Sequence, residues 1–142
     1  MILQGYLDQG SSFFKLLRGI YSFAIIDLRE KMELILVRNP GGVKPLYYKE
    51  DAGVMFASEI KAIKALSVQN SSIEEKSIKQ YLNLGFIPEP STVYKDIHSI
   101  RPGYILRFSN NKIVYYKPFF EHRFDHINAY FFEENVKKTQ CF

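Results

Sequence analysis

Apolar positions recur first at helical and then at strand spacing along the opening part of the chain. Residues 2–7 show helical spacing, and Gly10 is expected to end that helix. Residues 20–27 are apolar on both faces apart from one serine, which predicts a strand that is covered on both sides. A polar turn over 28–31 then leads to a partner strand over 33–37, so a β-hairpin is expected here.

Hydroxyl and glycine positions predict two further helices. Ser11 or Ser12 is expected to cap a short helix that stops at Gly19, because hydroxyl oxygens accept hydrogen bonds from the free N–H groups of a helix start. A longer helix is predicted over 74–84 and ends at Gly85. The apolar face of that longer helix consists of Ile78, Tyr81 and Leu82.

The stretch 38–66 is expected to alternate strands and turns before it becomes helical. Asn39–Gly42 predicts a sharp turn, because proline fixes one backbone dihedral and the paired glycines permit positive φ. Ser58 is expected to be the N-cap of the helix that follows, with Glu59 in its first turn. Between the turn and this helix, strands are expected over 46–49 and 54–57.

Two strands joined by a tight turn are the last regular elements expected. Residues 87–92 are expected to form a rigid extended loop, since each of its prolines also restricts the residue before it. Strands then follow over 104–108 and 112–116. They meet around 109–111, where asparagine tolerates the left-handed region.

The order of residues in the central stretch resembles the glutamine amidotransferase domain of the asparagine synthetase family. In that family, a strand ending in Arg-Asp leads through a glycine turn into Lys-Pro-Leu-Tyr-Tyr and later into Phe-Ala-Ser-Glu-Ile-Lys-Ala. Asn39 departs from the family's aspartate, and the resemblance runs from Ile2 to about Tyr116. The matching central positions are Arg38, Gly42, Lys44–Tyr48 and Phe56–Ala62.

Two more segments carry the resemblance. The family's Gly-x-x-(Phe/Tyr)-Ala-Phe-Ala-Ile-x-Asp hairpin corresponds to Gly19–Asp27, and its Pro-x-Pro-x-Thr loop lies within Tyr81–Thr92. The resemblance implies an α+β fold, a partial N-terminal-nucleophile hydrolase sandwich with antiparallel sheets and packed helices. It makes residues 1–116 the C-terminal part of a class II glutamine amidotransferase domain and leaves 117–142 as an aromatic-rich tail.

Composition narrows the classes of function. A chain of 142 residues forms at most one domain, and a net charge of +4 without clustered basic runs does not favour nucleic-acid binding. We see no membrane-spanning stretch and no signal peptide after Met1, so a cytoplasmic protein is expected. The single cysteine, Cys141, excludes a disulfide within the chain, which agrees with a reducing compartment.

The resemblance also indicates where catalytic groups are expected. In the family, the cysteine exposed by removal of the initiator methionine attacks the glutamine amide, and its own α-amine is the base. Ile2 stands at that position here, and Cys141 lies at the opposite end of the chain. The family's glutamine clamp, an Arg, an Asn-Gly-Glu turn and an Asp, would precede Met1. We therefore expect no catalytic residue in this chain and no activity of the chain alone.

No cofactor or metal site is expected either. The family's Ser-Gly-Gly-x-Asp-Ser loop, which holds ATP phosphates, does not occur, so ATP and magnesium belong to the full-length proteins. His122 and His126 are four residues apart, but a pair without a third ligand is expected to be a surface pair. His98 is expected to be exposed in a loop.

Four polar residues stand within apolar surroundings in the matched segment: Arg38, Lys44, Ser58 and Glu59. The resemblance places them near the junction of the amidotransferase and synthetase domains. The interpretation that we favour is structural, with Arg38 and Glu59 pairing or tying the turn to the helix start.

Three hypotheses follow for the chain. It is part of a glutamine-dependent, asparagine-synthetase-like amidotransferase, whose partners are the missing N-terminal half of the domain and the synthetase domain, in the same or a separate chain. Alternatively, it is a non-catalytic binding or regulatory remnant, or a decayed gene product. Half of a sandwich leaves a raw sheet edge and an uncovered apolar face, so marginal stability or self-association is expected.

Overall fold

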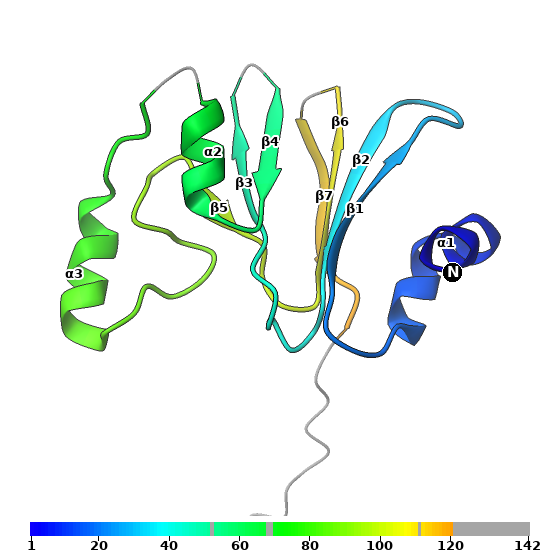
Figure 1. Cartoon of the computed structure of the whole chain (residues 1–142), viewed down its shortest axis with the longest axis horizontal. Helices are drawn as coiled ribbons and strands as arrows, with labels where there is room; N and C mark the ends of the chain where they lie inside the picture. Colours follow the sequence, from blue (N-terminus) through cyan, green and yellow to red (C-terminus); the bar gives the residue numbers. More distant parts are fainter. Residues whose placement is uncertain (52, 68–69, 111, 121–142) are drawn as a thin grey trace, which may run out of the picture.

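The computed structural model describes residues 1–51, 53–67, 70–110 and 112–120. Two antiparallel sheets pack face to face, and helices cover the outer side of each sheet (Figure 1). The layers therefore run helix, sheet, sheet, helix, which confirms the expected α+β sandwich with packed helices.

The larger sheet contains the two hairpins that the sequence predicted. Its strands are antiparallel and follow the order β1-β2-β6-β7. Asn110 takes a positive φ of 51° in the turn between the last two strands, as expected of an asparagine there. The strands are β1 (Ser22–Asp27), β2 (Glu33–Arg38), β6 (Tyr104–Ser109) and β7 (Lys112–Pro118).

The smaller sheet is antiparallel, short and narrow. Its order is β4-β3-β5, so β4 and β5 are its edges. The two strands expected after the Asn39–Gly42 turn are both present. The strands are β3 (Tyr47–Glu50), β4 (Val54–Ala57) and β5 (His98–Ser99).

Two helical segments precede the larger sheet. Helix α1 (Ile2–Gln9) ends at Gly10 as predicted. The segment after it is a 3-10 helix, η1 (Gly10–Leu16), which has no side-chain cap, so the expected Ser11 or Ser12 cap is wrong. A Cβ on Gly5 would run into the ring of Phe13, and glycine at this position therefore lets η1 pack against α1.

Helices α2 (Ile60–Leu66) and α3 (Glu75–Leu84) lie on the side of the smaller sheet. The predicted N-cap of α2 is wrong, because the cap position is Glu59, which has extended backbone and no capping side-chain bond. Helix α3 agrees with its prediction. The Glu74 carboxylate accepts from the Lys76 N–H at its start, and Gly85 closes it with a φ of 77°.

The core has two parts, one on each face of the larger sheet. The face toward α1 and η1 is centred on Phe14. The face toward the smaller sheet brings Tyr48 against Phe108 with ring centroids 5.7 Å apart. The first cluster contains Tyr6, Phe14, Ile25, Ile35, Val37, Ile105 and Phe119, and the second contains Leu36, Leu46, Tyr48, Ile100, Leu106 and Phe108.

Strand β1 is covered on one face only, so the prediction that both its faces are covered is wrong for this chain. Ile25 is buried against the helices, but Ala24 and Ile26 on the other face are exposed, Ile26 by 65%. Among the described residues, the smaller sheet has three strands, and it covers the middle of the larger sheet but not β1. The predicted apolar face of α3 is also exposed. None of the helices described is long and apolar enough to cross a bilayer.

Candidate functional site

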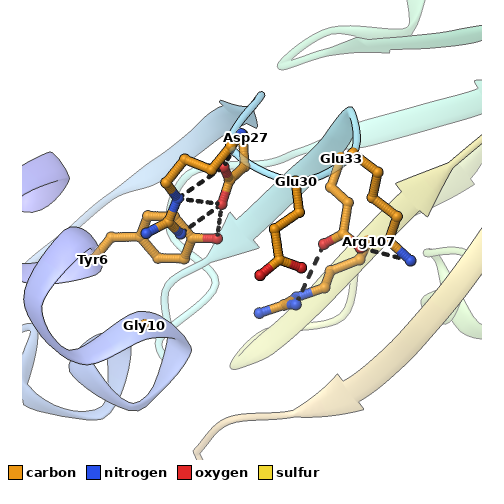
Figure 2. A pocket seen from close by; sticks show the side chains of 8 residues that line it. Tyr6, Gly10, Asp27, Glu30, Glu33 and Arg107 are labelled. Carbon is orange, nitrogen blue, oxygen red and sulfur yellow. Dashed lines mark hydrogen bonds and ion pairs between the residues drawn. The ribbon is translucent and has the colours of Figure 1, made fainter.

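A polar cavity of about 530 Å³ lies at the turn of the β1–β2 hairpin, beside α1 (Figure 2). Tyr6 and Gly10 line its helical side. Its acidic residues are Asp27, Glu30 and Glu33, and its basic residues are Arg29, Lys31 and Arg107, so the formal charges cancel.

Asp27 is the centre of one half of this cavity. Its carboxylate accepts from the Tyr6 hydroxyl at 2.7 Å, from Arg29 Nη2 at 2.7 Å and from the Arg29 backbone N–H at 3.1 Å. The hydrogen bonds from Arg29 and Tyr6 hold the pKa of Asp27 well below its usual range. Burial and the hydrogen bond to Asp27 raise the pKa of Tyr6. This cluster ties the hairpin turn to α1.

Arg107 is the centre of the other half. Figure 2 shows the side chains of Glu30 and Glu33 directed toward its guanidinium. Arg107 Nη1 lies 3.4 Å from Glu33 Oε2, and Nη2 donates to Ser11 Oγ. Lys31 Nζ lies 3.5 Å from the other oxygen of Glu33. These contacts join β2, β6 and η1, and together with the Asp27 cluster they form an ion-pair network between the larger sheet and its helices.

A buried arginine organises the opposite end of the hairpin strands. Arg38 is 4% exposed. Its Nε donates to the Lys44 carbonyl at 3.0 Å, and its Nη2 donates to the Gly42 carbonyl at 2.7 Å. Arg38 therefore holds the backbone of the Asn39–Gly42 turn from inside. Gly42 is required there, because its φ is +63° and a Cβ would lie 2.7 Å from Pro102 Cγ.

The remaining nitrogen of Arg38 reaches residues that are distant in the sequence. Nη1 lies 2.7 Å from Glu89 Oε1, 3.1 Å from Ser99 Oγ and 2.5 Å from the Ile100 carbonyl. The ion partner of Arg38 is thus Glu89, and the expected pairing with Glu59 is wrong. The reason is the fold, which brings the loop before β5 against the end of β2.

The other three residues that the sequence singled out lie at the surface. Lys44, Ser58 and Glu59 are exposed, and Lys44 contributes its backbone carbonyl to the Arg38 cluster. Glu59 lies 2.7 Å from Lys61, and both side chains are more than half exposed. The four residues therefore do not form one site within this chain, and their expected place at a domain junction stays a prediction.

Sequence reasoning missed a second buried cation, Lys49 on β3. Its side chain is 3% exposed, and its Nζ lies 2.9 Å from Asp96 and 3.3 Å from Ser71 Oγ. Burial opposes ionisation of Asp96, but hydrogen bonds from Lys49 and Ser71 outweigh it and lower the pKa of that carboxyl. Neighbouring residues of a strand point to opposite faces of its sheet, so the sequence indicated only that Lys49 faces away from Tyr48. It did not indicate that Lys49 is buried.

Among the described residues, no three His, Cys, Asp or Glu side chains are placed so that they could hold a metal ion together. His98 lies on β5, half-buried, with its ring centroid 5.5 Å from that of Tyr48, so the expectation of an exposed loop residue is wrong. His122, His126 and Cys141 lie outside the described residues, as does most of the 117–142 tail. Three of the ion pairs described above join distant segments of the fold, namely Arg38–Glu89, Lys49–Asp96 and Arg107–Glu33, and the others join residues two positions apart.

Comparison with known proteins relates this chain to glutamine amidotransferase domains and to glutamine-hydrolyzing asparagine synthetases. The family model for the glutamine amidotransferase domain matches residues 1–120. Glutamine-hydrolyzing asparagine synthetase 1 of Bacillus subtilis is 33% identical over 110 residues, which are 76% of this chain and 17% of that protein. A putative glutamine-hydrolyzing asparagine synthetase 2 of Methanocaldococcus jannaschii is 33% identical over 115 residues, 79% of this chain and 22% of that protein.

A relative with a different name also matches. Amidase chyE of Penicillium rubens is 29% identical over 122 residues, which are 85% of this chain and 17% of that protein. The chain thus spans 17% to 22% of the length of these curated relatives.

Proposed function

The chain belongs to the glutamine amidotransferase domain family, and on that premise we propose that it is part of an asparagine-synthetase-like protein that hydrolyses glutamine and passes ammonia to an ATP-activated aspartate. The observation that carries the proposal is that the family match, residues 1–120, coincides with the described helix–sheet–sheet–helix fold. The names of the Bacillus subtilis and Methanocaldococcus jannaschii relatives support the choice of reaction.

The role proposed for this chain is to build and hold part of the amidotransferase domain. Its buried charged residues serve this purpose, because Arg38 fixes the turn after β2 and Lys49 ties β3 to the Ser71 and Asp96 segments. The cavity network fixes the β1–β2 turn against α1. Arg38, Lys49 and Asp27 each have a partner in another segment of the fold, and structural ion-pair networks hold segments together in this way.

The reacting groups are proposed to come from residues outside this chain. A cysteine at the start of the amidotransferase domain would attack the glutamine amide, with its α-amine as the base. ATP and magnesium would be held by a synthetase domain. The relatives are several times longer than this chain, which leaves room for both in the parent protein or in a separate subunit.

The direct test is the intact mass of the native polypeptide in its source cells, measured after capture with an antibody against this chain. The proposal predicts a polypeptide, or a stable complex, several times heavier than 16.6 kDa that begins with cysteine after methionine removal. A native product of 16.6 kDa that co-purifies with no cysteine-initiated subunit would contradict it.

A further inference from the structure

The two halves of the polar cavity at the β1–β2 turn differ in how tightly their charges are paired. In one half, both carboxylate oxygens of Asp27 accept hydrogen bonds from Arg29, at 3.0 Å and 2.7 Å. In the other half, Arg107 Nη1 lies 3.4 Å and Lys31 Nζ lies 3.5 Å from Glu33. Charge-assisted hydrogen bonds between such groups span about 2.7–2.9 Å. The Arg107 half therefore holds charged groups whose bonding capacity is only partly used.

Glu30 is a carboxylate of this half that the fold leaves unpaired. Its side chain is exposed, and Figure 2 shows it directed toward the Arg107 guanidinium. No ion pair or hydrogen bond joins the Glu30 side chain to any other residue in the described part of the chain. Glu33 and Arg107 are largely removed from water, with side chains 17% and 27% exposed. A ligand between these groups would meet charges that salt screens less than charges at an open surface.

The balance of charges in the cavity limits the kind of ligand that fits. The lining includes three acidic and three basic side chains, so its formal charges cancel. A ligand with a single charge would be attracted by one set and repelled by the other, whereas a ligand with both charges can pair with both sets. The Glu33 carboxylate lies 3.4 Å from the Arg107 guanidinium, so the two charges of the ligand must lie close together. In an α-amino acid the ammonium and the carboxylate share one carbon.

The cavity also has room for a molecule of this size. Its volume of about 530 Å³ falls within the range of about 300–1,000 Å³ that is typical of small-molecule sites. On the helical side, a Cβ built on Gly10 would meet nothing within 4 Å. This side of the cavity therefore leaves space for the side chain of an amino acid.

We propose that the Arg107 half of this cavity binds a neutral α-amino acid. The carboxylate of the ligand accepts hydrogen bonds from Arg107, its ammonium donates to Glu30 and Glu33, and its side chain lies toward Gly10. The ligand thereby joins the β1–β2 turn to β6 and η1. Such a site adds amino-acid binding to the proposed function and does not depend on it.

The test compares L-alanine with two molecules that each carry one of its charges. Propionate is alanine without the ammonium group, and ethylamine is alanine without the carboxylate. Each is titrated at neutral pH into the isotope-labelled 142-residue chain, and the NMR signals of the backbone amides are followed. The same titrations use Glu30→Gln, which removes the charge and keeps the size of the side chain. The matched control is Glu75→Gln, on the exposed first turn of α3, across the molecule from α1 (Figure 1).

L-alanine should shift the amide signals of the β1–β2 turn in a saturable way, and propionate and ethylamine should each bind about tenfold more weakly or worse, because each loses hydrogen bonds to charged groups. Glu30→Gln should weaken the binding of L-alanine by a similar factor, and Glu75→Gln should leave it unchanged. The absence of a saturable shift in the turn would overturn the inference. So would equal binding of propionate or ethylamine, or equal affinity of the Glu30→Gln variant for L-alanine.

Discussion

The two faces of the larger sheet differ in what covers them. Toward α1 and η1, Phe14 and Ile35 are 0% exposed, and β1 contributes its buried Ile25 to the same cluster. Toward the smaller sheet, Leu36 is equally buried, but Ile26 on β1 is 65% exposed. Strand β1 is therefore covered on one face and exposed to water on the other.

The difference follows from where the covering elements come from. The helices that cover the first face immediately precede β1 in the chain, so local sequence supplies them. The second face needs a sheet as wide as its own, and the smaller sheet has three short strands against four. In the described part of the chain, β1 is therefore covered on the helical side of the larger sheet and left open on the side that faces the smaller sheet.

The largest expected effect compares a buried side chain on η1, Phe14, with an exposed one on β1, Ile26. Phe14→Ala should lower the free energy of unfolding by about 3–5 kcal/mol, because it leaves a cavity in a filled core. Ile26→Ala should change it by no more than about 0.5 kcal/mol in the isolated chain, because the side chain is already in water. Urea unfolding followed by circular dichroism measures both. Comparable losses would show that the second face is covered in solution.

Buried and exposed cations provide a second contrast of similar size. Arg38→Ala should cost about 3–5 kcal/mol, because it removes the ion-pair partner of Glu89 and leaves the carbonyls of Gly42, Lys44 and Ile100 without the hydrogen bonds that Arg38 donates. Lys61→Ala, which breaks the exposed pair with Glu59, should cost at most about 1 kcal/mol. Urea midpoints measured side by side test this. If Arg38→Ala lowers the free energy of unfolding by less than about 1 kcal/mol, Arg38 does not hold the turn in place.

The cavity network predicts a smaller, pH-dependent effect. Asp27 has a folded-state pKa below its unfolded value of about 3.9. Its contribution to stability is therefore complete above that value and is lost as the pH falls toward the folded-state pKa. Asp27→Asn should lower the urea midpoint at pH 7, and the difference from the unsubstituted chain should begin to shrink below about pH 4 and continue to shrink toward the folded-state pKa. Asp8→Asn, on exposed α1 surface, is the control. A pH-independent difference would mean that Asp27 acts by packing alone.

The smallest expected effect concerns the sheet–sheet interior. Burial raises the pKa of Tyr48 to about 12. The stability that its neutral form provides is present below the unfolded pKa of about 10 and is lost as the pH rises toward 12. Tyr48→Phe keeps the ring, costs less than about 1.5 kcal/mol at pH 8 and should lessen the loss of stability between pH 10 and 12. Tyr81→Phe, on an exposed position, should leave that alkaline loss unchanged.

Much of the fold could be predicted because its signals are local. The hairpin of β1 and β2 follows from apolar runs around a polar turn, and Gly85 ends α3 in the left-handed conformation expected of a glycine C-cap. The family assignment rests on the ordered match in the central stretch, which the family model confirms.

The rest depends on contacts that no local pattern encodes. Arg38 meets Glu89 across 51 positions of sequence, and nothing near either residue selects that partner over Glu59. The exposure of Ile26 depends on the width of the other sheet. The position of the α2 start was wrong for a smaller reason, since Ser58 has the right side chain one residue too early and remains exposed.

The structural role proposed for this chain requires that the reacting groups of the amidotransferase lie outside it. The most direct measurement is glutamate release from glutamine by the purified 142-residue chain, with Bacillus subtilis asparagine synthetase 1 as the positive control and the Cys141→Ser variant beside it. We expect no release above the enzyme-free rate from either form of the chain. Release that disappears with Cys141→Ser would contradict it.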